Sequence, residues 1–206
     1  QGKHLNKFSF VNSEKSWIIF TKHGINIKDY KLIHNYLKEH YKNLRPRKSK
    51  DQKEGRKPGN YEWYEIQDNT AYSNLFDLPK VTWMNMNRQW KFTYVPPGYF
   101  IEASLNFVAN EKYAKFLVGV YSSSLHKWFF KQIGRMFDDG GFMCKIDSIS
   151  EFPVVNPKDN EKLIVEKYVD KLTKNYNQKD EIKLDEIIMN LYNLNENEKN
   201  IIRSSS

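Results

Sequence analysis

Short apolar runs with a strand-like pattern occupy the first half of the chain. Five of them combine β-branched or aromatic residues and are bounded by turn-forming residues, a combination typical of β-strands. They are Ser16–Phe20, Tyr61–Ile66, Leu78–Trp83, Trp90–Tyr94 and, as an extended piece after a Pro-Pro-Gly turn, Tyr99–Ala103. A late strand is predicted at Phe142–Ile146, after a tight loop at Asp138–Gly141.

Longer stretches repeat their apolar residues every three or four positions, the spacing of one face of an α-helix. The first, Tyr30–Leu44, stops before Pro46, which would break a helix. Two more, Tyr113–Tyr121 and Leu125–Met136, follow the strands. The last part of the chain holds three, at Ile164–Leu172, at Ile182–Tyr192 and from Asn195 onwards. Glu198 completes a capping-box variant at the start of the last one.

Strands mixed with helices, followed by helices alone, predict an α+β protein. We expect a mixed or antiparallel sheet with packed helices over residues 1–157, followed by a C-terminal helical region over residues 158–206. The apolar stripes of that region exceed what a solvated tail needs, so we expect them to pack on a neighbouring domain. Gln1 in place of a starting Met, together with the closing run of serines, suggests a piece of a longer protein.

The charge along the chain is uneven. The whole chain has 33 Lys and Arg against 25 Asp and Glu, a net charge of +8. Residues 151–206 carry nine basic against eleven acidic side chains, so residues 1–150 hold a net +10. A basic body beside a mildly acidic tail predicts a polyanionic partner, such as nucleic acid, for the body only. The alternative is a lysine-rich composition with no such partner.

Signatures of catalysis are missing from the sequence. The five histidines are scattered, Cys144 is the single cysteine, and no HExxH, CxxC, phosphate-binding glycine loop or Gly-x-Ser-x-Gly elbow occurs. We therefore expect no active site, no metal site and no cofactor in this chain. The lone cysteine favours a cytoplasmic setting, and no apolar run is long enough for a membrane helix. A stand-alone metal-dependent nuclease is the alternative, with Asp138, Asp139 and Glu151 as its usable carboxylates.

A constellation of basic, amide and aromatic side chains is left after these exclusions. Trp83–Lys91 places asparagine, arginine and glutamine between two tryptophans, and such polar side chains form paired hydrogen bonds with adenine and guanine in the major groove. The base-reading candidates are Asn85, Asn87, Arg88 and Gln89. Lys and Arg neutralise phosphates, which positions a protein on DNA. The phosphate-contact candidates are Arg45, Arg47, Lys48, Arg56, Lys57, Lys80 and Lys91, with Lys131 and Arg135 four residues apart on one predicted helix.

These assignments have structural alternatives. Trp83–Lys91 would then be a polar hairpin with its tryptophans in the core, and Lys131 with Arg135 would lie on a solvated helix face. Residues 45–60 are polar, basic and rich in turn formers, which predicts a loop that is mobile without a partner. Trp63 and its neighbour are expected to anchor their strand to the core.

Six segments, in a fixed order, resemble a known family. They are LKEHYKNLRPR (37–47), WYEIQ (63–67), LPKVTW (78–83), FLVGVYSSSLHKWFF (116–130), ISEFPVV (149–155) and LDEIIMNLYNLNENEKNII (184–202). In this order they resemble the TaqI-like C-terminal specificity domain, the target-recognition domain of type IIG restriction–modification enzymes and related adenine methyltransferases. The chain departs from the pattern at Ser122–Ser123, where the family has Asn-Ser, and at Asn193, where it has Gly. Asn is the usual substitute for Gly at a left-handed helix cap, so the fold prediction stands.

The resemblance implies a DNA-binding module without its catalytic partner. In the family, methylation and cleavage reside upstream of this domain, so S-adenosylmethionine and magnesium are expected in the parent protein rather than in this chain. The implied function is sequence-specific recognition of double-stranded DNA for a linked adenine methyltransferase or endonuclease, which would flip an adenine out of the duplex. The alternative from another class is a protein-interaction subunit whose basic surface meets an acidic partner.

Overall fold

The computed structural model describes residues 1–11 and 16–205, and it divides into two compact units. Residues 1–13 and 75–206 form one, which we call the sheet unit, and residues 14–74 form the other, the basic unit. The basic unit carries thirteen Lys and Arg against eight Asp and Glu. The predicted boundary at residue 157 does not coincide with the boundary between these units, and it stays a prediction.

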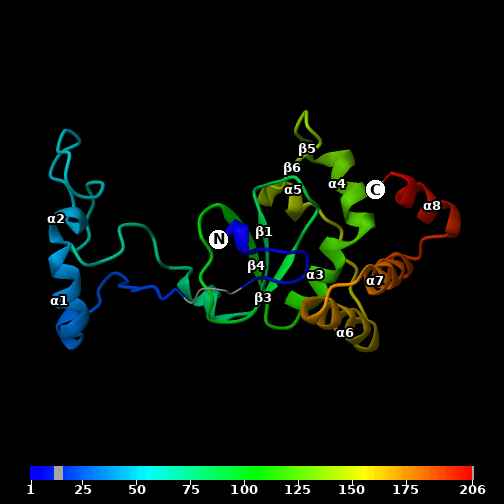
Figure 1. Ribbon diagram of the computed structural model, residues 1–206, viewed down its shortest axis with the longest axis horizontal. Coiled ribbons are helices and arrows are strands. Elements are labelled where there is room, and N and C mark those ends of the chain that lie inside the picture. Colours follow the sequence, from blue (N-terminus) through cyan, green and yellow to red (C-terminus); the bar gives the residue numbers. More distant parts are fainter. Residues whose placement is uncertain (12–15, 206) are drawn as a thin grey trace. The chain divides into compact units, whose positions relative to one another are not determined.

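The sheet unit is built around a three-stranded antiparallel sheet (Figure 1). β1 (Lys80–Met84) lies in the middle, between β3 (Thr93–Val95) and β4 (Leu105–Ala109). Val81 in β1 lies opposite Tyr94 in β3. Four of the five residues of β1 are buried, because the strand is covered on both faces.

A second, smaller antiparallel sheet follows the first along the chain. It contains β2 (Met86–Asn87), β5 (Arg135–Met136) and β6 (Phe142–Met143), with β6 in the middle. The predicted tight loop at Asp138–Gly141 joins β5 to β6, and Gly140 within it has a φ of +82°. Since β2 comes directly after β1, this small sheet carries the polar stretch that the sequence singles out.

Three helices pack beside the sheets. α3 (Ala114–Ser122) is the core helix, since eight of its nine residues are buried. α4 (Ser124–Ile133) begins after a sharp break at Ser123, whose side chain caps the new helix by accepting a hydrogen bond from His126 N. α5 (Ile146–Ser150) is a short turn of helix before the predicted extended exit.

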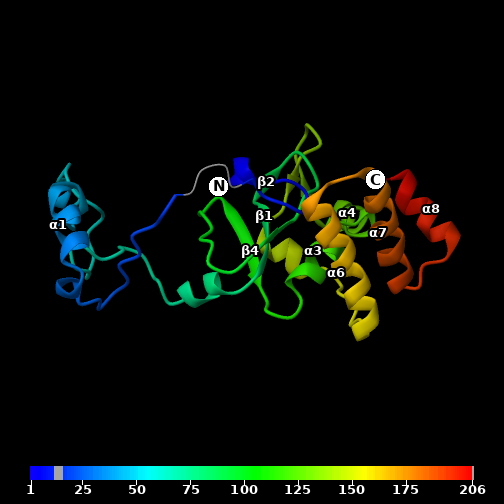
Figure 2. The same ribbon diagram turned by 60° about the horizontal axis from the view of Figure 1, so that its bottom comes forward.

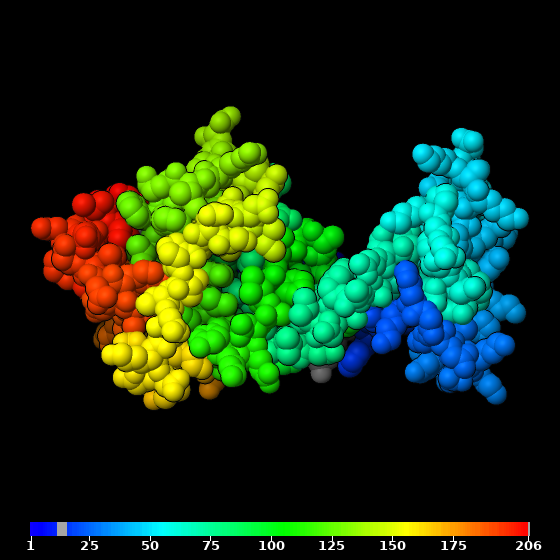
Figure 3. Space-filling model, turned by 180° about the vertical axis from the view of Figure 1, so that it is seen from behind, coloured from blue at the N-terminus to red at the C-terminus, as the bar shows by residue number. Residues whose placement is uncertain are grey.

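The C-terminal part forms three further helices of the sheet unit (Figure 2), and its residues lie against the rest of that unit (Figure 3). They are α6 (Asp159–Lys174), α7 (Gln178–Leu191) and α8 (Glu196–Ser204). α6 approaches α3 closely at Gly119, where a Cβ atom would lie 2.6 Å from Cγ1 of Val165. The apolar stripes of α6 and α7 thus pack on α3, on α4 and on each other. This corrects the expectation that a neighbouring domain covers these stripes.

Local signals at the end of the chain act as the sequence predicts. Asn195 N lies 2.8 Å from Glu198 Oε2, and Glu198 N lies 3.1 Å from Asn195 Oδ1, so the capping box is confirmed. Asn193 has a φ of +55°, which confirms that it takes the left-handed position of the family's glycine. α8 is then fixed by the Lys199 ammonium, which lies 2.5 Å from a carboxylate oxygen of Glu186.

Two short 3-10 helices and an N-terminal segment complete the sheet unit. η1 (Gly2–His4) opens the chain, and η3 (Ser73–Asp77) leads into β1. Phe8 N donates to Phe92 O at 2.9 Å, and Tyr94 N donates to Phe8 O at 3.2 Å. The first residues of the chain therefore lie along the outer edge of β3, although about 85 residues separate the two segments in the sequence.

The basic unit contains the first predicted long helix, in two pieces. η2 (Ile27–Asp29) precedes α1 (Lys31–Glu39), and α2 (Tyr41–Leu44) follows after a break at His40. The helix ends before Pro46, as predicted. After it, residues 45–60 are an irregular loop, which the sequence also predicts.

Two strands predicted for this unit are absent from the described residues. Residues 16–20 form no strand, residues 16–19 are exposed, and Trp17 is 90% exposed. Residues 61–66 form turns held by the buried Glu65 carboxylate, which accepts a hydrogen bond of 2.6 Å from Gly24 N. Both predictions were wrong because a run of strand-forming residues needs a neighbouring strand. At residues 61–66 the Glu65 carboxylate accepts backbone hydrogen bonds instead.

The predicted strands of the sheet unit are present but shifted. The strand expected at Trp90–Tyr94 pairs as β3, three residues later at its start. The extended piece at Tyr99–Ala103 pairs with no described strand, and β1 has β4 as its second partner beside β3. The strand expected at Phe142–Ile146 is only two residues long. The predicted α+β class, with packed helices and a helical C-terminal region, is nevertheless confirmed.

Candidate nucleic-acid interface

The stretch after β2 forms a turn that displays two polar side chains. Asn87 is 8% exposed, and its Oδ1 accepts a hydrogen bond of 3.2 Å from Gln89 N. This local bond fixes the turn, so Arg88 and Gln89 point outward. The Arg88 side chain is 87% exposed, and its Nη2 lies 2.9 Å from Oδ2 of Asp139 on the β5–β6 loop. Asn87 is thus a turn-forming residue, which corrects its assignment as a base reader.

Asn85 lies at the base of this turn in a hydrogen-bonded network. Its Oδ1 accepts from Nδ2 of Asn106, which also lies 3.2 Å from Cys144 O. Trp83 and Trp90 are buried, and Trp83 Nε1 donates to the same Cys144 carbonyl at 2.8 Å. The tryptophans therefore belong to the core, as the structural alternative expected, while the polar residues between them form a supported turn.

Lys80 is buried in β1 and serves the fold. Its ammonium donates to the backbone carbonyls of Phe76 at 3.0 Å, Pro96 at 3.3 Å and Tyr99 at 3.3 Å. The side chain is fully shielded from solvent, and burial lowers its pKa to about 8 against a smaller opposing effect of Asp77. A buried ammonium does not reach a phosphate on the surface. This corrects the expectation that Lys80 faces DNA.

The remaining cationic candidates of the sheet unit differ in their surroundings. Lys91 is half-buried, and its ammonium donates to Leu5 O at 3.0 Å. Lys131 is exposed on α4, and its ammonium donates to Ser205 O. α4 ends two residues before Arg135, which is exposed on β5. The expected pair on one helix face is therefore wrong, although both side chains remain on the surface.

Two arginines of the basic unit close its loop. Arg47 donates through Nε to Arg56 O and through Nη1 to Gln52 O, both at 3.2 Å. Arg56 donates through Nε to Leu44 O at 2.6 Å and through Nη2 to Trp63 O at 3.0 Å. Both side chains are half-buried. Their guanidinium groups thus shape the loop, and their assignment as phosphate contacts stays a prediction.

The exposed cations of this loop gather at its tip. They are Lys48, Lys50 and Lys53. None of them forms an ion pair with another described residue, whereas Arg45 lies 3.9 Å from Glu54 and Lys57 pairs with Asp68. The Lys57 hydrogen bond lowers the pKa of the Asp68 carboxyl. Of the three, only Lys48 is a phosphate-contact candidate from the sequence, and the signal for the other two is their place between the loop-closing arginines.

An aromatic cluster forms the centre of the basic unit. The Trp63 ring centroid lies 5.5 Å from that of His34, 5.2 Å from that of Tyr41 and 5.5 Å from that of Tyr64. Trp63 is half-buried among these rings. The expected packing role of Trp63 is confirmed, although the strand on which it was placed is not formed.

The alternative site for a metal-dependent nuclease does not come together. Within residues 1–11 and 16–205, no group of three or more His, Cys, Asp or Glu side chains is placed to hold a metal ion. Asp138, Asp139 and Glu151 therefore do not form such a group, and Asp139 is paired with Arg88. Among the described helices, none is long and apolar enough to cross a membrane.

The family profile of the TaqI-like C-terminal specificity domain matches residues 2–154. The chain belongs to this family. Members are specificity domains of restriction–modification enzymes, a role consistent with DNA recognition. No curated protein matches the chain significantly. The resemblance seen in the sequence is therefore confirmed over residues 2–154, whereas its last segment, 184–202, lies beyond the match and stays a prediction.

The structure places the segments that carry the TaqI-like pattern. WYEIQ (63–67) lies in the aromatic centre of the basic unit, and LPKVTW (78–83) leads into and forms most of β1. FLVGVYSSSLHKWFF (116–130) covers α3, the break and α4. The family match ends before α6, so α6, α7 and α8 lie outside it even though they pack against α3 and α4. The family pattern thus marks the inner framework of both units.

Proposed function

We propose that this chain reads a specific sequence in double-stranded DNA on behalf of a type IIG-like restriction–modification enzyme. The observation that carries the proposal is the Arg88–Gln89 turn, in a chain that belongs to a specificity-domain family. Arg pairs with guanine and Gln with adenine in the major groove. Both side chains stand on a turn braced by Asn87, and a braced turn loses little conformational entropy when it binds.

The other polar groups divide into supporting and positioning roles. Asn85 holds the base of the Arg88–Gln89 turn, which we call the reading turn, through its hydrogen bond with Asn106 of β4. Phosphate contacts come from the exposed lysines of the basic unit's loop tip, together with Lys57, Lys131 and Arg135. Arg45, Arg47 and Arg56 keep the loop in shape, and Lys91 ties the reading turn to the N-terminal segment.

The chemistry belongs to the rest of the parent protein in this proposal. A linked adenine methyltransferase would use S-adenosylmethionine, and a linked endonuclease would use magnesium, while this chain places them on their site. An adenine must leave the stack before it is methylated, so the recognition module has to hold the duplex in register during that step. We place the parent enzyme in the cytoplasm, which the single, buried Cys144 favours.

The test is fluorescence anisotropy of the chain with duplex DNA over a salt series. We expect log K to fall linearly with log salt, with a slope of about −0.9 for each neutralised phosphate. Selection from a random duplex pool should then enrich one short site. Binding that ignores salt, or that never enriches a sequence, would contradict the proposal and favour a protein partner for the basic surface.

A further inference from the structure

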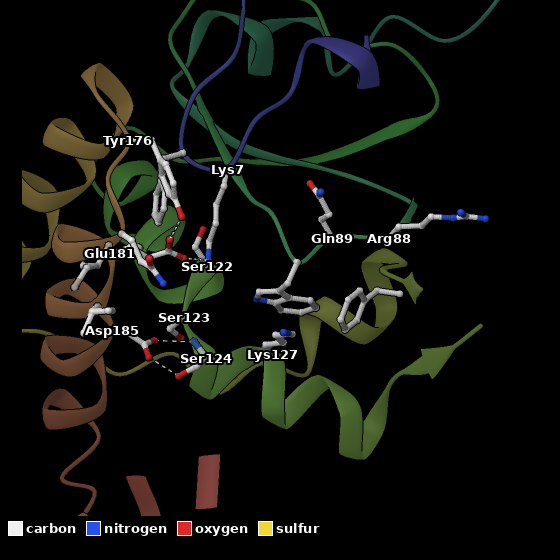
Figure 4. A pocket seen from close by; sticks show the side chains of 17 residues that line it. Lys7, Arg88, Gln89, Ser122, Ser123, Ser124, Lys127, Tyr176, Glu181 and Asp185 are labelled. Carbon is white, nitrogen blue, oxygen red and sulfur yellow. Dashed lines mark hydrogen bonds and ion pairs between the residues drawn. The ribbon is translucent and has the colours of Figure 1, made fainter. Parts of the chain in front are cut away.

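A pocket of about 520 Å³ opens beside the break between α3 and α4 (Figure 4). All of its walls belong to the sheet unit. They come from the N-terminal segment at Lys7, from the reading turn at Arg88 and Gln89, from Ser122–Lys127 at the helix break, and from Tyr176–Asp185 at the start of α7. With Phe142 of β6, the pocket therefore joins five parts of the sequence next to the turn proposed to read DNA.

The two carboxylates of the pocket already have donors. Glu181 accepts from the Lys7 ammonium and from the Tyr176 hydroxyl. Asp185 accepts from Ser124 N at 2.7 Å and from the Ser124 hydroxyl, at the N-terminus of α4. Figure 4 shows both groups at one side of the pocket. The Lys7 ammonium therefore balances the charge of Glu181, whereas both oxygens of Asp185 are occupied by neutral donors of Ser124.

Lys127 is a cation of the pocket that has no partner in the described part of the chain. It is half-buried on α4, and its ammonium has no hydrogen-bond or ion-pair partner among residues 1–11 and 16–205. Partial burial, followed by the nearby charges of Lys131 and Lys7, lowers its pKa. An anion beside this ammonium would offset the repulsion from the two neighbouring lysines. Among the cations that line the pocket, Lys7 is paired with Glu181 and Arg88 with Asp139, so Lys127 is the one without a partner among the described residues.

Ser122 supplies a buried hydroxyl that also favours an anionic ligand in this pocket. It is 3% exposed, it lines the pocket, and its Oγ has no partner among the described residues. The adjacent Ser123 hydroxyl, by contrast, donates to Val120 O at 2.6 Å. A buried hydroxyl without a partner is rare and unfavourable, and a ligand oxygen in the pocket would accept a hydrogen bond from it.

We propose that this pocket binds a phosphate-class oxyanion between the Lys127 ammonium and the Ser122 hydroxyl. Lys7 adds a second positive charge at the rim while keeping its bond to Glu181. The oxyanion is either a backbone phosphate of DNA or the phosphate of a free small molecule, since both present the same oxygens. The proposal rests on the pocket alone and does not require that the chain reads DNA.

The test is a titration of the isotope-labelled chain with inorganic phosphate at constant ionic strength, followed by amide chemical shifts. We expect saturable shifts at Ser122–Lys127 and at Lys7. Lys127→Gln should weaken the affinity roughly tenfold, because it removes the charge-assisted hydrogen bond. Ser122→Ala, which is almost the same size, should weaken it by a smaller factor. Lys167→Gln, on the exposed face of α6, is the matched control and should change nothing.

The outcomes separate this proposal from the proposed function. Shifts that do not saturate, or that persist unchanged in Lys127→Gln, mean an adventitious ion only and overturn the proposal. Phosphate that competes with a duplex for the same resonances identifies the ligand as DNA backbone, whereas phosphate that binds equally well to the DNA-bound chain identifies a free phosphate. Saturable phosphate binding by a chain that binds no DNA would sink the proposed function and leave this site standing.

Discussion

Single ionisable residues in this chain have roles that their type alone does not reveal. Lys80 lies in a motif rich in basic and aromatic residues, yet its ammonium closes a loop by holding three backbone carbonyls. His126 is 1% exposed and stands edge-on to the ring of Phe152 at 5.0 Å. Both residues are polar groups used by the core, and both lead to predictions about stability.

Lys80→Met should destabilise the sheet unit by about 2–3 kcal/mol, because the replacement fills the space but leaves three carbonyls without their donor. Urea unfolding followed by circular dichroism measures this loss. Lys167→Met, at an exposed position of α6, is the control and should stay within about 0.5 kcal/mol of the original chain. Equal stability of the two variants would show that the Lys80 ammonium contributes nothing to the fold.

The stability of the sheet unit should fall in mild acid because of His126. Burial lowers the pKa of this ring from 6.5 to about 4, so between these values the unfolded chain binds a proton that the folded chain does not. The stabilisation is complete above about pH 6.5 and is lost as the pH falls towards 4, by about 2 kcal/mol at pH 5 relative to pH 8. His126→Phe should remove this share of the slope in urea unfolding at the two pH values. The same slope in both chains would contradict the prediction.

At the scale of elements, the reading turn and the basic loop differ in what they can do. The turn after β2 is braced by Asn87 and presents only two side chains, which suits the reading of bases. The loop of the basic unit is closed by Arg47 and Arg56 and presents lysines at its tip, which suits contact with phosphates. Base contacts specify a sequence and phosphate contacts position the protein, so variants of the two elements should behave differently.

Arg88→Ala should cost about 1–3 kcal/mol on the selected site and far less on random DNA, because it removes a base contact. The exchange of Lys48, Lys50 and Lys53 for Gln should weaken binding to all sequences alike. It should also make the slope of log K against log salt less steep, by the equivalent of up to about three phosphate contacts. Anisotropy titrations on both duplexes at several salt concentrations measure the two effects. A triple variant that loses affinity for the selected site alone would contradict this division.

At the scale of the whole molecule, the C-terminal helices are part of the folding unit. α6 lies against α3 at Gly119, where even one added carbon would meet Val165. α7 and α8 then contact α4. The family profile stops at residue 154, so the chain completes its core with helices that lie outside the family match.

A chain ending at residue 157 should therefore fail to unfold cooperatively, because removal of α6 exposes the buried face of α3 to water. Thermal melting by circular dichroism and binding of a hydrophobic dye compare it with the full chain. We expect a broad transition and strong dye binding for the shortened chain. A sharp transition within a few degrees of that of the full chain would support the boundary at residue 157 instead.

The sequence by itself determined the features whose causes are local. The capping box at Asn195, the left-handed Asn193 and the helix that stops before Pro46 follow from side chains that bond or clash within a few residues. The order of the family segments was also in the sequence, and with it the membership. Only the tertiary structure decided which strands form and which cations are exposed, as Ser16–Phe20 and Lys80 show. Strand pairing and burial depend on partners far along the chain, and neither composition nor periodicity specifies those partners.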